Sequence, residues 1–273
     1  MMKKISYLFL VALLFSCEEE ISVSNLDADT LVVTAYLYAN QPIDSIKVTK
    51  SFSIVEEPIL QVVDGLSITI NDGSEDIQLE SIGGGYYRNL DHIAKTDRTY
   101  KIEFEHDEKI ISAETYVNPE VDIMLSQKTV ELERIFYDGG FPNFSTSNEI
   151  VDITWSNLSS DYYFVIVEHI EDNQDYVNEI FKERINVEDI PEQFFRSEPE
   201  IIDAYSINSM RELRLYGTYK IIVYRLNAEY AALYETLGSS TLSIQEPPSN
   251  INNGLGIFTS VTPHIFFLEV IEK

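Results

Sequence analysis

Cysteine is almost missing from this sequence, and the other residues that bind metals or act as nucleophiles are scarce as well. The 273 residues include one cysteine and four histidines, and no two histidines have the close spacing of zinc ligands. A disulfide within one chain is therefore excluded, and stability has to come from packed cores. Neither a Gly-x-Ser-x-Gly nucleophile elbow nor a phosphate-binding loop is present. From these patterns we expect no catalytic residues, no cofactor and no metal site.

Basic residues are also few. The chain has 19 lysines and arginines against 46 aspartates and glutamates, which gives a formal net charge of −27. Such a field repels phosphate backbones, so nucleic acid is excluded as a partner class. It argues equally against electrostatic adsorption to anionic lipid. An excess of acidic residues more often keeps a protein soluble than recognises a ligand, so the net charge does not identify a ligand.

Long apolar runs are missing with one exception near the amino terminus. Residues 5–15 form an apolar run after Lys3 and Lys4, and this run is shorter than the roughly 20 residues that span a bilayer as a helix. A basic start followed by a short apolar run is typical of an export signal. We predict a signal peptide over residues 1–16 and expect no transmembrane helix.

The only cysteine follows this apolar run directly. Leu14-Phe15-Ser16-Cys17 resembles the lipobox of bacterial lipoproteins, in which the cysteine is joined to diacylglycerol and the chain is cut before it. The alternative, a buried unpaired thiol, does not suit a position between an apolar leader and an acidic triplet. Acyl chains contribute about 0.8 kcal/mol per buried methylene, so several chains anchor a protein stably. We predict lipidation of Cys17, with outer-membrane lipid as its partner.

Three glutamates follow the cysteine. Glu18, Glu19 and Glu20 resemble the surface-export signal of lipoproteins from the Bacteroidota. This resemblance implies a location at the outer membrane, facing the cell exterior. The same charges also suit a solvated tether over residues 17–25, and both interpretations can hold together.

The chain is rich in apolar residues that recur in short alternating runs. Hydrophobic residues make up 44% of it, with 17 tyrosines and 14 phenylalanines, which is enough to build a core. Alternation and β-branched residues predict strands over 30–38, 45–51, 66–70, 76–80, 99–105 and 109–117. The turn Asn71-Asp72-Gly73 is a hairpin signal. Short strands at this spacing are typical of an immunoglobulin-like β-sandwich, which we place at residues 26–118.

Residues 119–273 predict a second β-rich, sandwich-like domain with one short helix. Its expected strands are 121–133, 149–155, 162–170, 217–224 and 264–271. We expect 149–155 and 162–170 to pair, with Trp155 in the core. Asn227 suits the N-cap of a helix over 228–237, and Gly238 suits its end. An acidic excursion at 168–203 is expected to be a solvated loop, with a helix or strand over 176–185.

Two other stretches require a choice between structure and binding. Asp72, Ser74 and Asp76 alternate like calcium ligands, but Gly83 stands where the bidentate glutamate is needed, so a hairpin turn is the better interpretation. In the stretch 250–258, Gly254 and Gly256 indicate left-handed or closely approached backbone, and the residues after them indicate a core. A structural corner is favoured there, and a ligand-contacting loop is the alternative.

Several of these features together resemble a known family. They are the lipobox, the strand that begins at Leu31, the Gly85-Tyr86-Tyr87 turn, the helix with Tyr230 and Leu233, and the stretch 250–258. They are similar to a family of Bacteroidota lipoproteins catalogued as a domain of unknown function, DUF4249. The most specific match is the stretch that contains Asn250, Asn253, Gly254, Gly256 and Phe258.

The resemblance implies a role but assigns no catalytic residue. Members are often encoded beside TonB-dependent receptors, which implies a surface accessory to nutrient uptake. Our leading hypothesis is therefore a non-enzymatic outer-membrane lipoprotein that captures a ligand or docks on a TonB-dependent receptor, with the ligand unknown. A surface hydrolase acting on glycans or peptides is one alternative. A structural or adhesive cell-surface protein is another.

Overall fold

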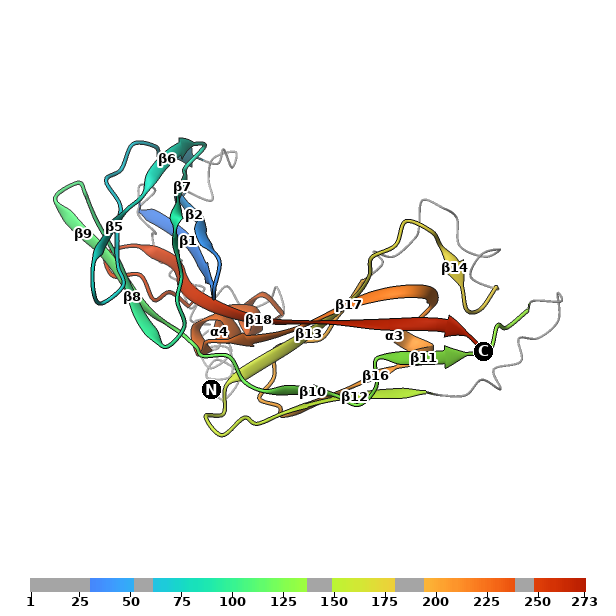
Figure 1. The fold of residues 1–273 in the computed structure, drawn as a ribbon. Helices are drawn as coiled ribbons and strands as arrows, with labels where there is room; N and C mark the ends of the chain where they lie inside the picture. The colour runs from blue at the N-terminus through green and yellow to red at the C-terminus, as the bar shows by residue number, and fades with distance from the viewer. Residues whose placement is uncertain (1–29, 52–60, 137–148, 180–193, 239–247) are drawn as a thin grey trace, which may run out of the picture.

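The computed structural model describes residues 30–51, 61–136, 149–179, 194–238 and 248–273. These residues form two β-sandwiches that follow one another along an elongated molecule (Figure 1). The mainly β architecture that the alternating sequence pattern predicts is therefore confirmed. No helix in these ranges is both long enough and apolar enough to cross a membrane.

The first sandwich packs one end of a large sheet against a four-stranded sheet. The strands of the large sheet in this unit are β1 (Leu31–Tyr38), β2 (Pro42–Lys50), β3 (Gln61–Val62), β6 (Glu80–Gly83) and β7 (Tyr86–Ile93). The four-stranded sheet has the order β5-β4-β8-β9, with β4 (Thr69–Asn71), β5 (Asp76–Gln78), β8 (Arg98–His106) and β9 (Lys109–Val117). The predicted immunoglobulin-like sandwich corresponds to this unit.

The predicted hairpin turn of the first sandwich is present, and a second tight turn connects the expected strands 99–105 and 109–117. Strands β4 and β5 pair around Asn71-Asp72-Gly73, with Asn71 opposite Asp76. Strands β8 and β9 pair from His106 opposite Lys109, so only Asp107 and Glu108 form the loop. Both loop residues have positive φ, as the tight two-residue hairpin turn requires.

The first core lies between the two sheets and is mostly aliphatic. Alternate residues of each strand point inward, because successive side chains of a strand face opposite sides of the sheet. The fully buried members include Val33, Leu37, Ile46, Val48, Ile70, Tyr87, Tyr100 and Ile102.

The second sandwich packs the other end of the large sheet against a three-stranded sheet. In the large sheet, β15 (Phe194–Arg196), β13 (Tyr162–His169), β17 (Leu215–Leu226) and β18 (Leu255–Glu272) are neighbours in that order, and β11 (Thr129–Leu132) and β14 (Asp175–Tyr176) pair beside them. The smaller sheet has the order β10-β12-β16, with β10 (Ile123–Leu125), β12 (Ile150–Trp155) and β16 (Ala204–Asn208). The helices within the described ranges are α3 (Ser209–Glu212) and α4 (Ala228–Gly238).

The expected pairing of 149–155 with 162–170 is wrong. Strand β12 pairs with β10 and β16, whereas β13 pairs with β15 and β17 in the opposite sheet. The turn at 157–161 therefore crosses from one layer to the other, which a local alternation pattern cannot distinguish from a hairpin. Trp155 does lie in the core as predicted, with 7% of its surface exposed and its ring centroid 4.9 Å from that of Tyr163.

The long strand β18 belongs to both sandwiches (Figure 1). Its first part, from Leu255 to Val261, runs parallel to β1, and its second part, from Val261 to Val270, runs antiparallel to β17. Ile251 and Phe258 are members of the first core. The structure thus adds to the first unit a segment that the sequence assigned to residues 119–273. A parallel pair needs a distant crossover, so no local turn signal announces it.

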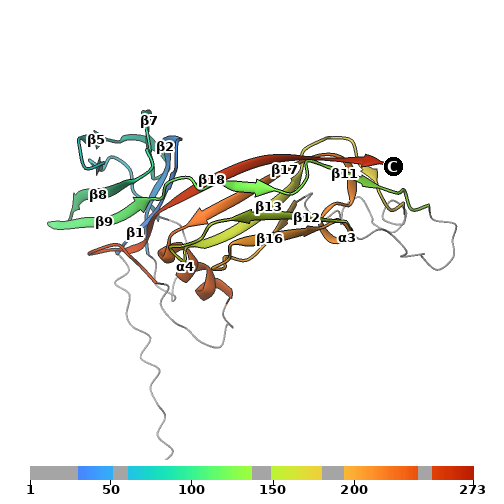
Figure 2. The ribbon, with the colours of Figure 1, turned by 60° about the horizontal axis from the view of Figure 1, so that its bottom comes forward.

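The predicted helix is present as α4, and it lies against the junction of the two sandwiches (Figures 1 and 2). Asn227 precedes it, and the backbone carbonyl of Asn227 accepts the first helical hydrogen bonds from the N–H groups of Tyr230 and Ala231. Helix α3 is a single additional turn. Of the stretch 176–185, Tyr176 is in strand β14 and Val177 is buried, while residues 180–185 lie outside the described ranges.

Candidate functional site

The anchor motif lies outside the part of the chain that the structure describes, because Cys17 and Glu18 to Glu20 precede residue 30. The other predicted stretch, 250–258, is described throughout, and its polar side chains bond within the fold. Asn250 is the clearest example: its Nδ2 donates to the carbonyl of Phe258 at 2.7 Å, and its Oδ1 accepts from the N–H of Phe258 at 2.9 Å. This side chain therefore provides hydrogen-bond partners for the two backbone groups of Phe258 on the edge of β18 that faces away from β1.

The rest of this stretch fastens β18 to both sheets of the first sandwich. Asn253 has a positive φ of 56°, and its Nδ2 donates to the carbonyl of Ile110 in β9 at 2.9 Å. Gly256 has φ of 105°, and a Cβ on it would lie 2.0 Å from the carbonyl oxygen of Val33. Gly254 has no positive φ, but a Cβ there would lie 3.2 Å from the carbonyl oxygen of Leu31. These contacts are those of a structural corner.

In the turn at residues 72–76, which resembles a calcium loop in sequence, the carboxylate of Asp72 bonds to groups of the protein itself. The carboxylate of Asp72 accepts hydrogen bonds from the N–H groups of Ser74 and Glu75, and the Nη1 of Arg98 lies 2.6 Å from its Oδ2. Burial raises the pKa of Asp72, but the two backbone donors and the charge of Arg98 outweigh burial, so the pKa is lowered. Asp72, Glu75 and His92 come close enough to share an ion. Because Arg98 already supplies the positive charge, the arrangement fits a hairpin turn better than a metal centre.

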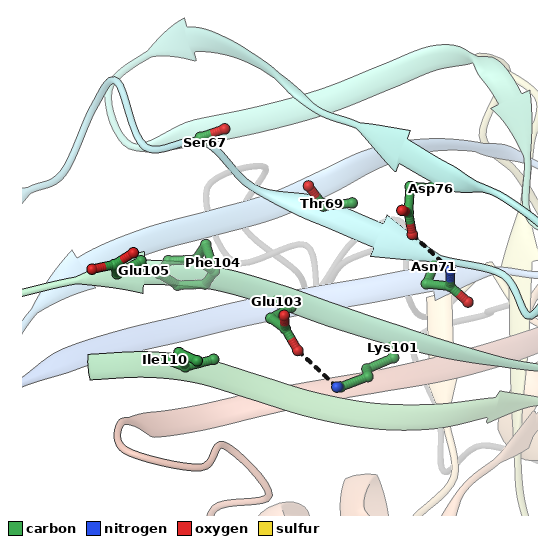
Figure 3. A pocket seen from close by; sticks show the side chains of 9 residues that line it. All are labelled: Ser67, Thr69, Asn71, Asp76, Lys101, Glu103, Phe104, Glu105 and Ile110. Atoms are coloured by element: carbon green, nitrogen blue, oxygen red, sulfur yellow. Dashed lines mark hydrogen bonds and ion pairs between the residues drawn. The ribbon is translucent and has the colours of Figure 1, made fainter. Parts of the chain in front are cut away.

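A polar groove of about 480 Å³ lies on the outer face of the four-stranded sheet (Figure 3). Four of its five charged and amide side chains are paired with one another, and the fifth is that of Glu105. The Nζ of Lys101 lies 2.7 Å from the carboxylate of Glu103, and the Nδ2 of Asn71 donates to Asp76 at 2.7 Å. A ligand would have to break these pairs, so the groove is a weak candidate for binding.

A second concavity, which we call the aromatic pocket, lies where the two sandwiches meet. It has a volume of about 200 Å³, and its rings are those of Tyr36, Tyr38, Phe164, Tyr224 and Tyr230. Its other lining residues are Ile166, Val261 and Arg196.

Strand register explains why these residues share one face. Tyr38 lies opposite Val261, Val261 lies opposite Leu226, and Tyr224 lies opposite Phe164 two residues further along. Directly paired residues and residues two apart on a strand point to the same side of a sheet. The inward neighbours of these residues fill the two cores, so this row is the outer face of the large sheet. Helix α4 then adds Tyr230 from above.

The rings of the aromatic pocket are arranged around Phe164. The ring of Phe164 stacks on that of Tyr224 with centroids 4.7 Å apart, and it lies nearly parallel to that of Tyr230 with centroids 6.2 Å apart. Arg196 lies above, with its guanidinium carbon 4.6 Å from the centroid of Phe164. Its Nη2 donates to the hydroxyl of Tyr230 at 2.9 Å. Aromatic stacking and a stacked guanidinium fix the geometry of this pocket.

The electrostatics of the pocket differ from those of the whole chain. Among the residues that the structure describes, Arg196 is its only charged lining residue, although the chain carries a net charge of −27. Burial is the main cause that raises the pKa of Tyr36, Tyr38 and Tyr224 above the ordinary value of 10.0. These hydroxyls are therefore protonated at neutral pH, and each can donate and accept a hydrogen bond.

A buried polar joint holds α4 in place over the pocket. The Oε1 of Glu229 accepts from the hydroxyls of Thr115 and Thr259, both at 3.1 Å. The Nδ2 of Asn227 donates to the carbonyl of Tyr116 at 2.9 Å and to the hydroxyl of Ser260 at 3.2 Å. The side chain of Asn227 thus bonds across to the first sandwich. Because the helix is tied to both β9 and β18, the pocket is formed before any ligand arrives.

Sequence reasoning did not identify the aromatic pocket. Tyr36 and Tyr38 were predicted only as residues of the strand 30–38. Tyr230 was predicted as a residue of the helix 228–237, which is one of the features that resemble the family. One signal was available: β1 carries large side chains on both faces, with aliphatic residues inside and two tyrosines on the outside. A strand that is apolar on both faces has a second surface to cover.

The fold and the pocket define a protein of two β-sandwiches, joined by a shared strand, with an aromatic cavity at the joint. Residues 18–264 match the family described as "Domain of unknown function (DUF4249)", and the chain belongs to that family. No curated protein matches the chain.

Among solved structures, the chain is similar to "Anomalous substructure of Titin-A168169", with 11% identity, 90% of this chain and 96% of that chain covered, and a TM-score of 0.20. It is also similar to "Crystal structure of domains A168-A170 from titin", with 12% identity, 89% and 67% covered, and a TM-score of 0.22. Scores this low carry no functional argument.

Proposed function

We propose that this chain is a non-enzymatic binding protein that is anchored in the outer membrane of a member of the Bacteroidota and captures a ligand during nutrient uptake. The observation that carries the proposal is the aromatic pocket: five rings and one guanidinium converge on a preformed concavity at the joint of two sandwiches. Concave sites lined by aromatic residues with a few polar groups at their rim are the usual form of a small-molecule site.

The chemistry of the pocket favours binding over hydrolysis. A glycosidase or peptidase site needs at least two converging groups that exchange protons near neutral pH. Within the described part of the chain, the one charged residue that lines the aromatic pocket is Arg196, and a guanidinium keeps its proton in proteins. The tyrosine hydroxyls, with pKa values raised by burial, do not supply a base either.

The outer face of the large sheet supports a docking role beside the pocket. Ile265 is 49% exposed and Phe267 is 55% exposed on β18, in the same outward row as the pocket residues. Exposed apolar side chains on an open sheet face suit a protein partner. The partner we propose is a TonB-dependent receptor, which the family resemblance implies. An adhesive role would use the same face with a different partner.

The anchor is the second part of the proposal. Lipidated Cys17 would hold the protein in the outer membrane, and Glu18 to Glu20 would direct it to the outer face. Replacing Cys17 with alanine is expected to abolish labelling by a lipid analogue and to release the protein from the membrane fraction. Neutralising the three glutamates is expected to leave labelling intact and to remove accessibility to protease on whole cells. Membrane retention of the Cys17→Ala protein would contradict the anchor.

Co-purification tests the docking part of the proposal. The lipidated protein is expected to retain a TonB-dependent receptor from solubilised outer membranes. The double variant Ile265→Asp and Phe267→Asp is expected to lose it. Ile110→Asp is the matched control, because Ile110 is 56% exposed on the first sandwich, away from this face. Equal recovery of the receptor with both variants would exclude this face as the docking surface.

A further inference from the structure

We infer that the aromatic pocket binds a neutral saccharide ring, stacked on its tyrosine and phenylalanine rings and hydrogen-bonded by their hydroxyls. This inference rests on the proposed function and gives the chemical class of the captured ligand. Four observations on the pocket support it: its size, its rings, its hydrogen-bonding groups and its charge.

The size of the pocket admits one ring. Its volume of about 200 Å³ lies below the range of roughly 300 to 1,000 Å³ that is typical for sites of drug-sized ligands. A single pyranose ring is an object of the right scale, and a longer glycan could extend from it because the pocket opens at the molecular surface. A peptide helix or a folded partner would not enter.

The rings of the pocket match the apolar side of a sugar. A pyranose presents axial C–H groups on one face, and the negative face of an aromatic ring attracts such weakly positive hydrogens. Tyr36, Tyr38 and Tyr224 are each half-buried, so part of each ring remains accessible from the pocket. Phe164 lies beneath them with 5% exposure and serves as the packed floor on which the other rings rest.

The hydrogen-bonding groups match the hydroxyls of a sugar. Within the described ranges, no hydrogen bond is made by the hydroxyls of Tyr36, Tyr38 or Tyr224, whereas the hydroxyl of Tyr230 accepts from Arg196. A tyrosine hydroxyl both donates and accepts, and a guanidinium has five N–H donors, of which one here is committed to Tyr230. A ligand with alternating donor and acceptor hydroxyls can satisfy these groups, which an aliphatic ligand cannot.

Charge argues against ionic ligands of either sign. A cation such as a quaternary ammonium would normally suit a cage of tyrosines, but here the guanidinium of Arg196 already lies over Phe164. An anion would meet a single arginine in a chain with a net charge of −27. A neutral polyol ring is repelled neither by the guanidinium of Arg196 nor by the net negative charge of the chain.

The experiment compares neutral and charged ring-sized probes on the full mature chain. The neutral probes are methyl β-D-glucopyranoside, methyl β-D-galactopyranoside and methyl α-D-mannopyranoside. The charged probes are benzoate and tetramethylammonium. Saturation-transfer NMR reports which probe contacts the protein, and tyrosine fluorescence gives the Kd. We expect at least one glycoside to bind with a Kd of about 1 mM, which is appropriate for a single small ring.

Conservative variants tie binding to the pocket. Tyr38→Phe removes one hydroxyl and keeps the ring, and it is expected to weaken glycoside binding about tenfold, since one hydrogen bond is lost. Arg196→Gln is expected to have a similar effect through the loss of donors. Tyr86→Phe is the matched control, because Tyr86 is a 43% exposed tyrosine of the first sandwich outside the pocket. Circular dichroism of each variant verifies the fold.

The possible results separate this inference from the proposed function. Absence of glycoside binding up to about 50 mM, fifty times the expected Kd, would overturn the inference. Glycoside binding that Tyr38→Phe and Tyr86→Phe leave equally unchanged would also overturn it. Binding of benzoate alone, lost in Arg196→Gln, would replace the saccharide with an organic anion while the capture function stands. The receptor co-purification tests the docking part of that function independently of all these results.

Discussion

The two parts of β18 lie in one strand but in different environments. From Ile257 to Thr262 every residue is buried, because the first core covers one face and α4 with the polar joint covers the other. From Pro263 onward, burial follows the period of two that a sheet with one open face produces. Leu268 and Val270 point into the second core, while Ile265 and Phe267 point outward.

This difference shows how one strand can join two sandwiches with a defined geometry. The buried part is fixed from both sides and includes Thr259, Ser260 and Thr262, whose hydroxyls bond across the joint. The half-open part leaves one surface for contact with other molecules. We therefore expect substitutions in the first part to change the free energy of unfolding, and substitutions in the second part to change binding.

The largest effect is expected from Gly256→Ala in the buried part. The new Cβ would lie 2.0 Å from the carbonyl oxygen of Val33, and the φ of 105° disfavours any side chain. Strain and overpacking together are expected to cost about 3 to 6 kcal/mol of unfolding free energy, measured by urea denaturation. Gly73→Ala is the control: its φ is also positive, at 85°, but nothing lies within 4 Å, so about 1 to 2 kcal/mol is expected. Equal losses would show that close approach is unimportant.

Two phenylalanines of the same strand give the next comparison. Phe258 is 0% exposed in the first core, and Phe258→Ala is expected to cost about 3 to 5 kcal/mol. Phe267 is 55% exposed, and Phe267→Ala is expected to change the unfolding free energy by less than about 0.5 kcal/mol. Thermal and urea unfolding of both variants measure the difference. A large loss in Phe267→Ala would mean that the outer face is covered in the isolated protein.

A smaller effect is expected from Asn250→Ala, which leaves the packing of the buried part in place. Two backbone groups of Phe258 would lose their partner, because Asn250 bonds to both its N–H and its carbonyl. An unpaired buried polar group costs about 1 to 3 kcal/mol, so we expect a loss within or slightly above that range. Hydrogen exchange at the N–H of Phe258 is expected to accelerate more than exchange in β17. Unchanged exchange there would contradict the bridging role.

The same comparison explains what the sequence could predict. The alternation of 264–271 predicted the half-open part of β18 correctly, because period two is a local signal. The stretch 250–258, which leads into the buried part, was interpreted as a corner, since Gly254 and Gly256 indicate left-handed or closely approached backbone. Its partner β1 lies more than 200 positions earlier in the chain. Nothing near residue 256 in the sequence can indicate a parallel pairing over that separation.

The aromatic pocket could not be predicted from the sequence for a related reason. Tyr36, Phe164, Tyr224 and Tyr230 come from four elements, and only the order β13-β17-β18-β1 brings them onto one face. Each residue taken alone is a good strand or helix residue. Because 149–155 and 162–170 were expected to pair with each other, the strand order of the large sheet could not be predicted correctly either. Tyr36 and Tyr38, on the outer face of a strand whose inner face is buried, were the one local indication of a second covered surface.

The smallest effect concerns the boundary between the two parts of β18, at His264. Burial is the main cause that lowers its pKa below the ordinary 6.5, Glu120 opposes this shift, and Arg225 adds to it. The folded state therefore binds the proton less readily than the unfolded state, so the contribution of His264 to stability is present above pH 6.5 and is lost as the pH falls through the lowered pKa. The N–H of Val121 donates to Nε2 at 3.5 Å, which also requires the neutral ring.

Urea denaturation of the wild type between about pH 7.5 and pH 5.5 is expected to give a steeper loss of stability than that of His264→Gln, because glutamine does not titrate. The other three histidines are present in both proteins, so the difference between the two slopes isolates His264. Parallel slopes would mean that this position is as open to water as the outer face beside it. A clear difference would mean that half-buried His264 is still shielded from water, and the open outer face would then begin at Ile265.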